Sequence, residues 1–126
     1  MDDYNDLIQE SVESLGTEGY CDLAADVLLE FFPNAVLYRL TNKTGERFGH
    51  VFLVVDGCAL DINGFKSFEE MATNNDKLYP EPVARDAVRN YFRWHNRTSE
   101  ERRIVTERFR DHINQNIHLF TKNTNE

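Results

Sequence analysis

Three residue types that together can carry out nucleophilic chemistry occur in order within residues 19–64: Cys21, His50 and Asp61. A cysteine thiol can attack a carbonyl carbon, a histidine can accept the thiol proton, and an aspartate can hold the imidazole in one orientation. The cysteine opens an amphipathic segment, the histidine lies inside a strand-like run, and the aspartate follows one tight turn later. This order and local context predict a Cys-His-Asp thiol site.

Two helices are expected before the histidine. Apolar residues at helical spacing predict a first helix over residues 2–15, which Gly16 would end. A second helix is expected over residues 21–32, ended by Pro33, with Cys21 in its first turn on the buried side. An exposed acidic stripe is expected along the same helix at i, i+4 spacing: Asp22, Asp26 and Glu30.

Three strand-like runs follow, and the turn between the last two sets their register. The runs cover residues 35–40, 48–55 and 58–62. Asp56-Gly57 favours a two-residue type I′ turn, which requires positive φ at both positions. Such a turn places Val55 opposite Cys58, and the pairing of the two strands follows outward from there.

This register decides which side chains share a face of the sheet. Because side chains alternate along a strand, one face is expected to carry His50, Phe52, Val54, Ala59, Asp61 and Asn63. Asp61 is then the diagonal neighbour of His50 and Asn63 its direct neighbour, so that either can orient the imidazole. Cys58 lies on the opposite face. Cys21, and not Cys58, is therefore expected to share a site with His50.

Helical patterns dominate the rest of the chain. A capping box at residues 67–70 opens a short helix to about Thr73, and a polar loop is expected over residues 74–82. A further helical pattern covers residues 83–92, and Thr98 caps a last helix. The order α-α-β-β-β-α-α-α predicts an α+β fold with an antiparallel meander.

Length and composition are those of one globular domain. At 126 residues, of which 40% are hydrophobic, the chain can bury a core. We expect a single domain over residues 1–120 and a frayed polar tail over residues 121–126. No apolar run approaches the roughly 20 residues that cross a bilayer, and the acidic N-terminus is unlike a signal peptide. We therefore expect a cytoplasmic protein without membrane contact.

The net charge of −8 is unevenly distributed. Residues 1–38 contain nine acidic residues and no Lys or Arg, whereas most arginines fall between Arg85 and Arg110. The negative charge disfavours non-specific nucleic-acid binding. The asymmetry has three interpretations: two solvated faces of opposite sign, head-to-tail self-association into a homodimer, or docking of a cationic protein partner on the acidic end.

Two cysteines form neither a disulfide framework nor a cysteine-rich zinc site. A metal site built on Cys21, His50 and Asp61 would need a further ligand, and the sequence has no CxxC, HxxxH or HxxEH spacing. We expect no metal and no cofactor. The aromatic-basic run at residues 91–95 could form a nucleic-acid surface, but its helical spacing favours packing on the core with Trp94 partly exposed.

Residues 19–24 and 49–61, GYCDLA and GHVFLVVDGCALD, resemble the papain-like cysteine peptidase superfamily. The likeness is greatest to its compact transglutaminase-like and NlpC/P60-like members. The resemblance covers residues 19–64, about a third of the chain. It implies a papain-like α+β fold in which a Cys-bearing helix packs on a three-stranded antiparallel meander, with C-terminal helices.

The resemblance also implies a role for each site residue. Cys21 would be the nucleophile and His50 its general base, with Asp61 orienting His50 and Asn63 as the alternative third member. The backbone N–H of Cys21 would donate one hydrogen bond to the oxyanion. The family pattern has a glutamine shortly upstream as a second donor, which residues 12–20 lack, so Tyr20 or a backbone amide would have to take its place.

Two functions follow. The first is a small cysteine hydrolase or acyltransferase acting on an amide or thioester bond. The second is a catalytically silent interaction or inhibitor protein, of the kind found among phage and mobile-element accessory proteins, whose acidic N-terminal face binds a cationic protein. Asp22, directly after Cys21, bears on the choice because a carboxylate beside a thiol opposes thiolate formation.

Overall fold

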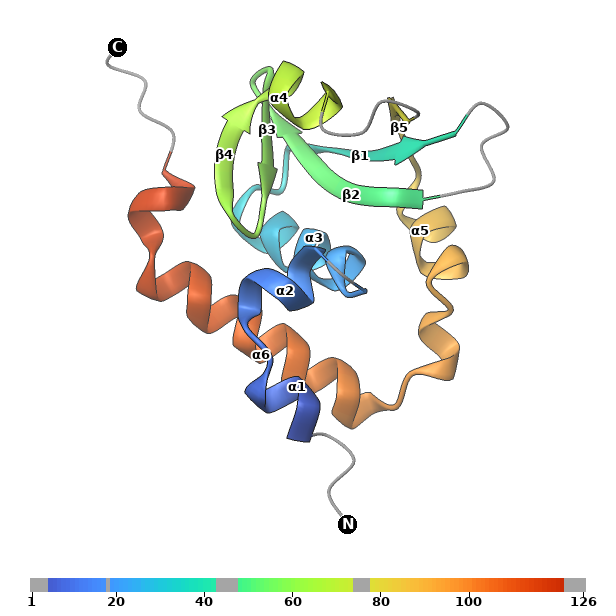
Figure 1. Ribbon diagram of the computed structural model, residues 1–126, viewed down its shortest axis with the longest axis vertical. Helices are drawn as coiled ribbons and strands as arrows, with labels where there is room; N and C mark the ends of the chain where they lie inside the picture. The colour runs from blue at the N-terminus through green and yellow to red at the C-terminus, as the bar shows by residue number, and fades with distance from the viewer. Residues whose placement is uncertain (1–4, 18, 43–47, 74–77, 122–126) are drawn as a thin grey trace.

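The computed structural model describes residues 5–17, 19–42, 48–73 and 78–121, which form an α+β fold around one antiparallel sheet (Figure 1). In chain order the elements are α1 (Asn5–Gln9), α2 (Val12–Thr17), α3 (Cys21–Phe31), β1 (Val36–Thr41), β2 (Phe48–Val55), β3 (Cys58–Asp61), β4 (Gly64–Ser67), α4 (Phe68–Thr73), β5 (Tyr79–Pro82), α5 (Arg85–Tyr91), the 3-10 helix η1 (Trp94–Asn96), α6 (Ser99–Gln115) and the 3-10 helix η2 (Ile117–Phe120). The strand order is β4-β3-β2-β1-β5, and every neighbouring pair is antiparallel.

The three expected strands are present, but the sheet has five strands rather than three. One extra strand, β4, follows a two-residue turn at residues 62–63 and begins at Gly64, whose φ of +105 is a conformation open to glycine. The other, β5, lies within the segment that we expected to be a loop. It contains Pro80 and Pro82 and sits at the sheet edge, where a residue without an N–H removes no hydrogen bond to a second neighbour.

The hairpin between β2 and β3 has the predicted geometry. Asp56 and Gly57 both have positive φ, 51 and 84, as a type I′ turn requires. Val55 pairs with Cys58, and the ladder continues to Leu53 and Leu60. The register inferred from the sequence is therefore confirmed.

The sheet is covered on both faces by apolar clusters. The larger cluster joins α3 to one face through residues that include Val51, Leu53 and Leu60. The smaller one packs α4 on the other face, against Phe52 and Ala59. Figure 1 shows α3 between the sheet and α6. The layers are therefore, in order, α4, the sheet, α3 and α6.

The N-terminal segment forms two short helices where we expected one. Gly16 lies inside α2 instead of ending a helix. A Cβ at this position would come within 2.3 Å of Cγ2 of Ile62, so the glycine allows the helix to approach the sheet closely. Residues 2–4 of the predicted helix lie outside the described part of the chain.

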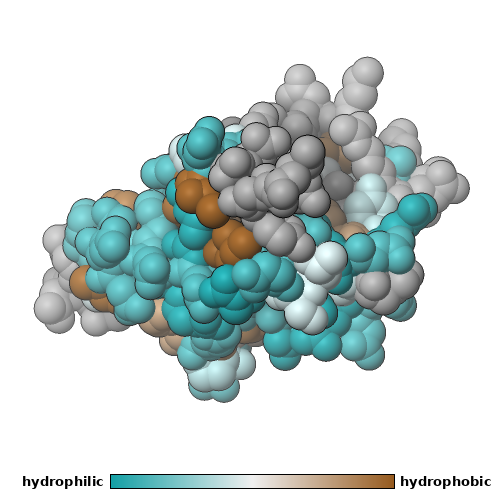
Figure 2. All heavy atoms as spheres, turned by 90° about the horizontal axis from the view of Figure 1, so that it is seen from below, coloured by the Kyte–Doolittle hydropathy of each residue, from teal (hydrophilic) through white to brown (hydrophobic). Residues whose placement is uncertain are grey.

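The C-terminal helix α6 completes the core behind α3. Its first turn is capped as predicted, because the Thr98 hydroxyl accepts the backbone N–H of Glu101 at 3.0 Å. Val105, Phe109 and Ile113 are its buried residues. The face on this side of the molecule is largely hydrophilic (Figure 2), as expected for an amphipathic helix that buries only one stripe. Of the tail predicted after residue 120, only Thr121 is described.

Candidate functional site

His50 and Asp61 form a buried contact across neighbouring strands. His50 lies on β2 and Asp61 ends β3, and the distance from His50 Nε2 to Asp61 Oδ2 is 3.1 Å. The two residues are 9% and 4% exposed. The His50 ring stacks beside Phe52, with ring centroids 6.2 Å apart, which places it on the face that α4 covers. The diagonal contact predicted from the hairpin register is therefore confirmed.

Asp61 is held as a carboxylate by its partners. Burial by itself raises its pKa, but the His50 hydrogen bond, the charges of His50 and Lys66 and the Asn63 amide together lower the pKa below its ordinary value. The backbone N–H of Asn63 donates to Asp61 Oδ1 at 2.9 Å. Asp61 therefore makes the contact with the imidazole, and Asn63 supports Asp61 through its backbone.

Lys66 is a member of this cluster that the sequence analysis did not identify. Its Nζ lies 3.8 Å from Asp61 Oδ2, so it acts on the carboxylate through its charge more than through a hydrogen bond. The pairing of Ala59 with Lys66 across β3 and β4 places Lys66 on the same face as Asp61. Asn63-Gly64 was a turn signal in the sequence, although the two turn residues are Ile62 and Asn63, one position earlier.

An open cavity of about 370 Å³ adjoins the His50–Asp61 pair. Besides these two residues, its lining comprises Thr17, Leu40, Gly49, Asn63, Lys66 and Met71. Polar groups predominate in this lining, and Asn63 is exposed to solvent. The imidazole can therefore be reached by a small ligand or by one side chain of a larger one.

Cys21 opens α3 and is buried to about the same extent as the dyad, but among apolar side chains. It is 5% exposed and belongs to the apolar cluster between α3 and the sheet. The pairing of β2 with β3 extends from Val55–Cys58 to Leu53–Leu60. The backbone N–H of Val51 lies past the last of these pairs. That amide donates to the Cys21 sulfur, so the sulfur lies beside the peptide bond that joins His50 to Val51.

The Cys21 side chain is a neutral thiol at neutral pH. Burial is the main reason that its pKa is raised to about 12; the charge of Asp22 adds to the rise, and the Val51 N–H opposes it. Among the hydrogen bonds of the described residues, none joins the Cys21 sulfur to the His50 ring, and Cys21 is not among the described residues that line the cavity. The structure thus brings His50 and Asp61 together, whereas Cys21 lies beside the His50 backbone in the apolar cluster on the opposite face of the sheet from the His50 ring. A site shared by Cys21 and His50 stays a prediction.

Tyr20 and Cys58 lie apart from the dyad. The Tyr20 hydroxyl donates to Glu101 Oε2 at 2.8 Å, and burial, then this hydrogen bond, raise its pKa to about 12. Its hydroxyl is therefore directed toward α6, and its contribution to an oxyanion site stays a prediction. Cys58 is partly buried next to the β2–β3 turn.

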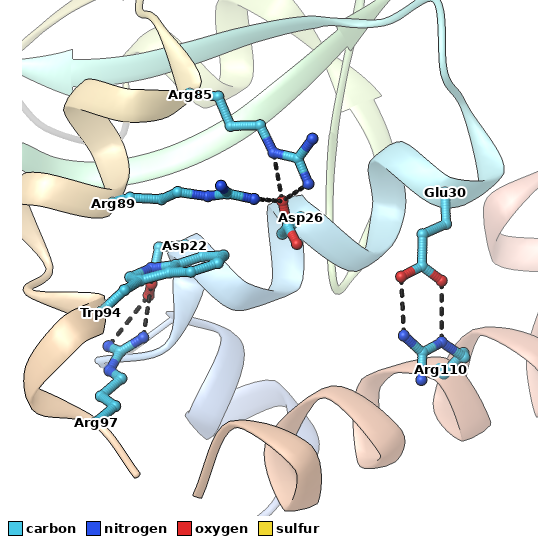
Figure 3. A network of polar contacts seen from close by, with 8 residues as sticks. All are labelled: Asp22, Asp26, Glu30, Arg85, Arg89, Trp94, Arg97 and Arg110. Atoms are coloured by element: carbon cyan, nitrogen blue, oxygen red, sulfur yellow. Dashed lines mark hydrogen bonds and ion pairs between the residues drawn. The ribbon is translucent and has the colours of Figure 1, made fainter. Parts of the chain in front are cut away.

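Asp22 is buried, contrary to the exposed stripe that we expected. It is 1% exposed. The indole N–H of Trp94 donates to its Oδ2, and Arg97 binds both oxygens, with Nη1–Oδ2 at 2.7 Å and Nη2–Oδ1 at 3.3 Å (Figure 3). Trp94 is partly buried, as predicted.

The other two acidic residues of the stripe are also paired within the chain. Arg85 Nε donates to Asp26 Oδ1 at 2.7 Å, with Arg89 of the same helix nearby. Arg110 binds Glu30 through two hydrogen bonds of 3.0 and 2.8 Å (Figure 3). The charge asymmetry of the sequence is thus partly an internal complementarity between α3 and the arginines after residue 84. This interpretation is not among the three drawn from the sequence, although the opposite charges of the two segments signalled it.

The described residues contain no group of three or more His, Cys, Asp or Glu side chains arranged to hold a metal ion. Every helix among them is too short or too polar to cross a membrane. Comparison of the chain with protein-family models, curated proteins and solved structures gave no match.

Proposed function

We propose that this protein is a small cysteine hydrolase or acyltransferase that acts on an amide or thioester bond through Cys21, His50 and Asp61. The observation that carries the proposal is the 3.1 Å contact between His50 Nε2 and Asp61 at an open polar cavity. A histidine oriented by a buried carboxylate is the arrangement that general-base catalysis requires. The proposed nucleophile is the Cys21 sulfur, which lies beside the His50–Val51 peptide bond on the other face of the sheet.

Each residue has a defined task in the proposed reaction. Because Asp61 occupies Nε2, Nδ1 of His50 is the ring nitrogen left to take the Cys21 proton. The sulfur attacks the carbonyl carbon, and the imidazolium returns its proton to the leaving amine or thiolate as the carbon–nitrogen or carbon–sulfur bond breaks. Water or an acceptor nucleophile, deprotonated by His50, then attacks the acyl thioester and releases Cys21. Asp61 stabilises the imidazolium in both steps.

The high pKa of Cys21 determines how the proton must move. With a thiol pKa of about 12, almost no thiolate exists at neutral pH, so a preformed thiolate–imidazolium pair is not the starting state. Proton transfer to His50 must accompany attack on the substrate, as it does for a serine nucleophile. This mode makes the rate strongly dependent on His50.

Acyl transfer from p-nitrophenyl acetate, a neutral activated ester, tests the proposal. We expect mass spectrometry to find an acetyl group on Cys21 and not on Cys58. His50→Ala should slow its formation by about 100-fold or more, the usual contribution of a general base. Cys58→Ala is the matched control and should acylate like the wild type. Equal, slow acylation of both cysteines, with no effect of His50→Ala, would contradict an enzymatic role.

One observation favours the second function, a catalytically silent interaction protein: the burial of Cys21 in an apolar cluster. Of the proposed acidic face, Glu10 and Glu13 are exposed, whereas Asp2, Asp3 and the Asp6 side chain lie outside the described part of the chain. In this alternative, Cys21→Ala keeps full biological activity, and charge reversal at Asp3, Asp6 and Glu10 removes it.

A further inference from the structure

Arg97 binds the chain on both sides of Cys21. Its Nη2 donates to the carbonyl oxygen of Gly19 at 3.0 Å, and its guanidinium lies over the Tyr20 ring, 4.8 Å from the centroid. Its two terminal guanidinium nitrogens also bind both oxygens of Asp22. Residues 19, 20 and 22 therefore contact one side chain, and the backbone N–H of Cys21, the proposed oxyanion donor, lies within this clamped stretch.

Arg97 also places a positive charge beside the Asp22 carboxyl. The Asp22 carboxyl directly follows Cys21, and its side chain is fully buried. The pKa of Asp22 is raised above its ordinary value, because burial outweighs the hydrogen bonds and charge of Arg97 and the Trp94 N–H, which lower it. A buried carboxylate without a partner is costly and repels a thiolate beside it. With the guanidinium bound, the Asp22 charge still raises the pKa of Cys21, but Cys21 lies next to an ion pair instead of an isolated negative charge.

The other charged groups near the start of α3 come from several neighbouring elements, and Glu13 on α2 is exposed to solvent. His50 on β2 and Asp61 on β3 form one pair, which Lys66 on β4 approaches. Asp26, one turn further along α3, is paired with Arg85 on α5. Glu101 on α6 accepts the Tyr20 hydroxyl. Among these described groups, Arg97 is the cation that binds the carboxyl group adjacent to Cys21.

We propose that Arg97 is a positioning residue for Cys21, which fixes the first turn of α3 and neutralises Asp22 so that the thiol can release its proton. The description of Cys21 as a nucleophile rests on the proposed function; the effect of Arg97 on thiol ionisation does not. A carboxylate beside a thiol opposes thiolate formation. Here an arginine 75 positions away in the sequence binds that carboxylate and offsets part of its charge.

Alkylation by iodoacetamide, a neutral reagent that reports the thiolate, tests this inference. The rate at Cys21 is followed by mass spectrometry between pH 7 and 10, with Cys58 as internal reference. We expect Arg97→Gln to slow Cys21 alkylation about tenfold at each pH, equivalent to one unit in the thiol pKa. A purely structural role predicts the opposite, because a loosened helix start would expose the sulfur and speed the reaction. Adding Asp22→Asn to Arg97→Gln should restore the rate to within about twofold, since the uncompensated charge is then gone.

Arg110→Gln is the matched control. Arg110 makes a comparable two-bond contact to Glu30 near the far end of the same helix, and its loss should leave Cys21 alkylation unchanged. If Arg97→Gln does not fold, Asp22→Asn alone carries the test, and it should speed Cys21 alkylation about tenfold because the guanidinium charge is then unopposed. The inference is overturned by a faster or unchanged rate in Arg97→Gln, by an equal slowing in Arg110→Gln, or by an unchanged rate in Asp22→Asn. If the alkylation rates change as expected but p-nitrophenyl acetate leaves no acetyl group on Cys21, the proposed function is overturned and the inference about Arg97 stands.

Discussion

At the scale of single residues, one oxygen atom concentrates the charge of the site. Asp61 Oδ2 lies 3.1 Å from His50 and 3.8 Å from Lys66. The shorter distance is a hydrogen bond and the longer one is an ion pair, so His50 sets the geometry and Lys66 contributes charge. The other oxygen accepts the Asn63 amide. A buried carboxylate with three such partners is satisfied, and removing its charge leaves the partners without an acceptor.

This arrangement predicts a pH-dependent cost for Asp61→Asn. The pKa of Asp61 in the folded chain is below its ordinary value of 3.8, so its carboxylate stabilises the fold above that value, and the contribution is lost as the pH falls through the folded pKa. At pH 7 the variant should lose about 1–3 kcal/mol in free energy of unfolding. Urea unfolding at pH 7 and near pH 3 measures the difference. A cost that does not shrink at the lower pH would contradict the assigned role.

At the scale of elements, the β3–β4 turn positions Asp61 and packs against η2. Asp61 pairs with Gly64 across this turn. A Cβ at Gly64 would lie 2.8 Å from the carbonyl oxygen of Leu119, a backbone atom that cannot rotate away. The 3-10 helix η2 therefore packs on β4 at a spacing that only glycine permits.

Gly64→Ala should destabilise the protein more than Gly57→Ala. Both glycines have positive φ, +105 and +84, but a Cβ at Gly57 would meet no atom within 4 Å. The two variants share the backbone strain, so their difference isolates the steric contact. We expect Gly64→Ala to cost about 1–3 kcal/mol more in the free energy of unfolding, as overpacking commonly does. Urea titration of both variants makes the comparison, and equal costs would show that η2 does not pack there as described.

At the scale of the whole molecule, α6 closes the core from behind α3. The buried side chains of α6 belong to the same apolar cluster as Cys21 and the sheet. The internal ion pairs join the same parts, because α3 supplies acids and the segments after residue 84 supply arginines (Figure 3). The half-exposed Arg110–Glu30 pair adds little to stability, whereas the buried Asp22–Arg97 pair mainly determines which packing is allowed.

Phe109→Ala tests whether these parts form one cooperative unit. Phe109 is 0% exposed, and its truncation should cost about 3–5 kcal/mol. Trp94 fluorescence and far-UV circular dichroism should shift together in a urea titration, since one transition is expected for a shared core. Ile117→Ala is the control: Ile117 is 51% exposed, and its truncation should cost no more than about 0.5 kcal/mol. Two separate transitions would show that α6 folds independently of the sheet.

The His50–Asp61 contact could be predicted from residues 50–61 alone, because it depends on local rules. Side-chain alternation and the Asp56-Gly57 turn set the register within a single hairpin. The start of α3 at Cys21 and the capping of α6 by Thr98 were equally local. Such features depend on residues a few positions away in the sequence, so they can be predicted without knowing the tertiary structure.

The environment of Cys21 was decided only by tertiary structure. Helical periodicity placed Asp22 on an exposed face because nothing local indicates that Trp94 and Arg97, 72 and 75 positions later, cover it. The fifth strand likewise depends on pairing with β1, and the close approach of α2 at Gly16 depends on Ile62. The sequence by itself thus specified the contact between His50 and Asp61, since a hairpin brings them together. The burial of the thiol, its raised pKa and the arginine that neutralises its neighbour arise from long-range packing, because desolvation is a property of the assembled core.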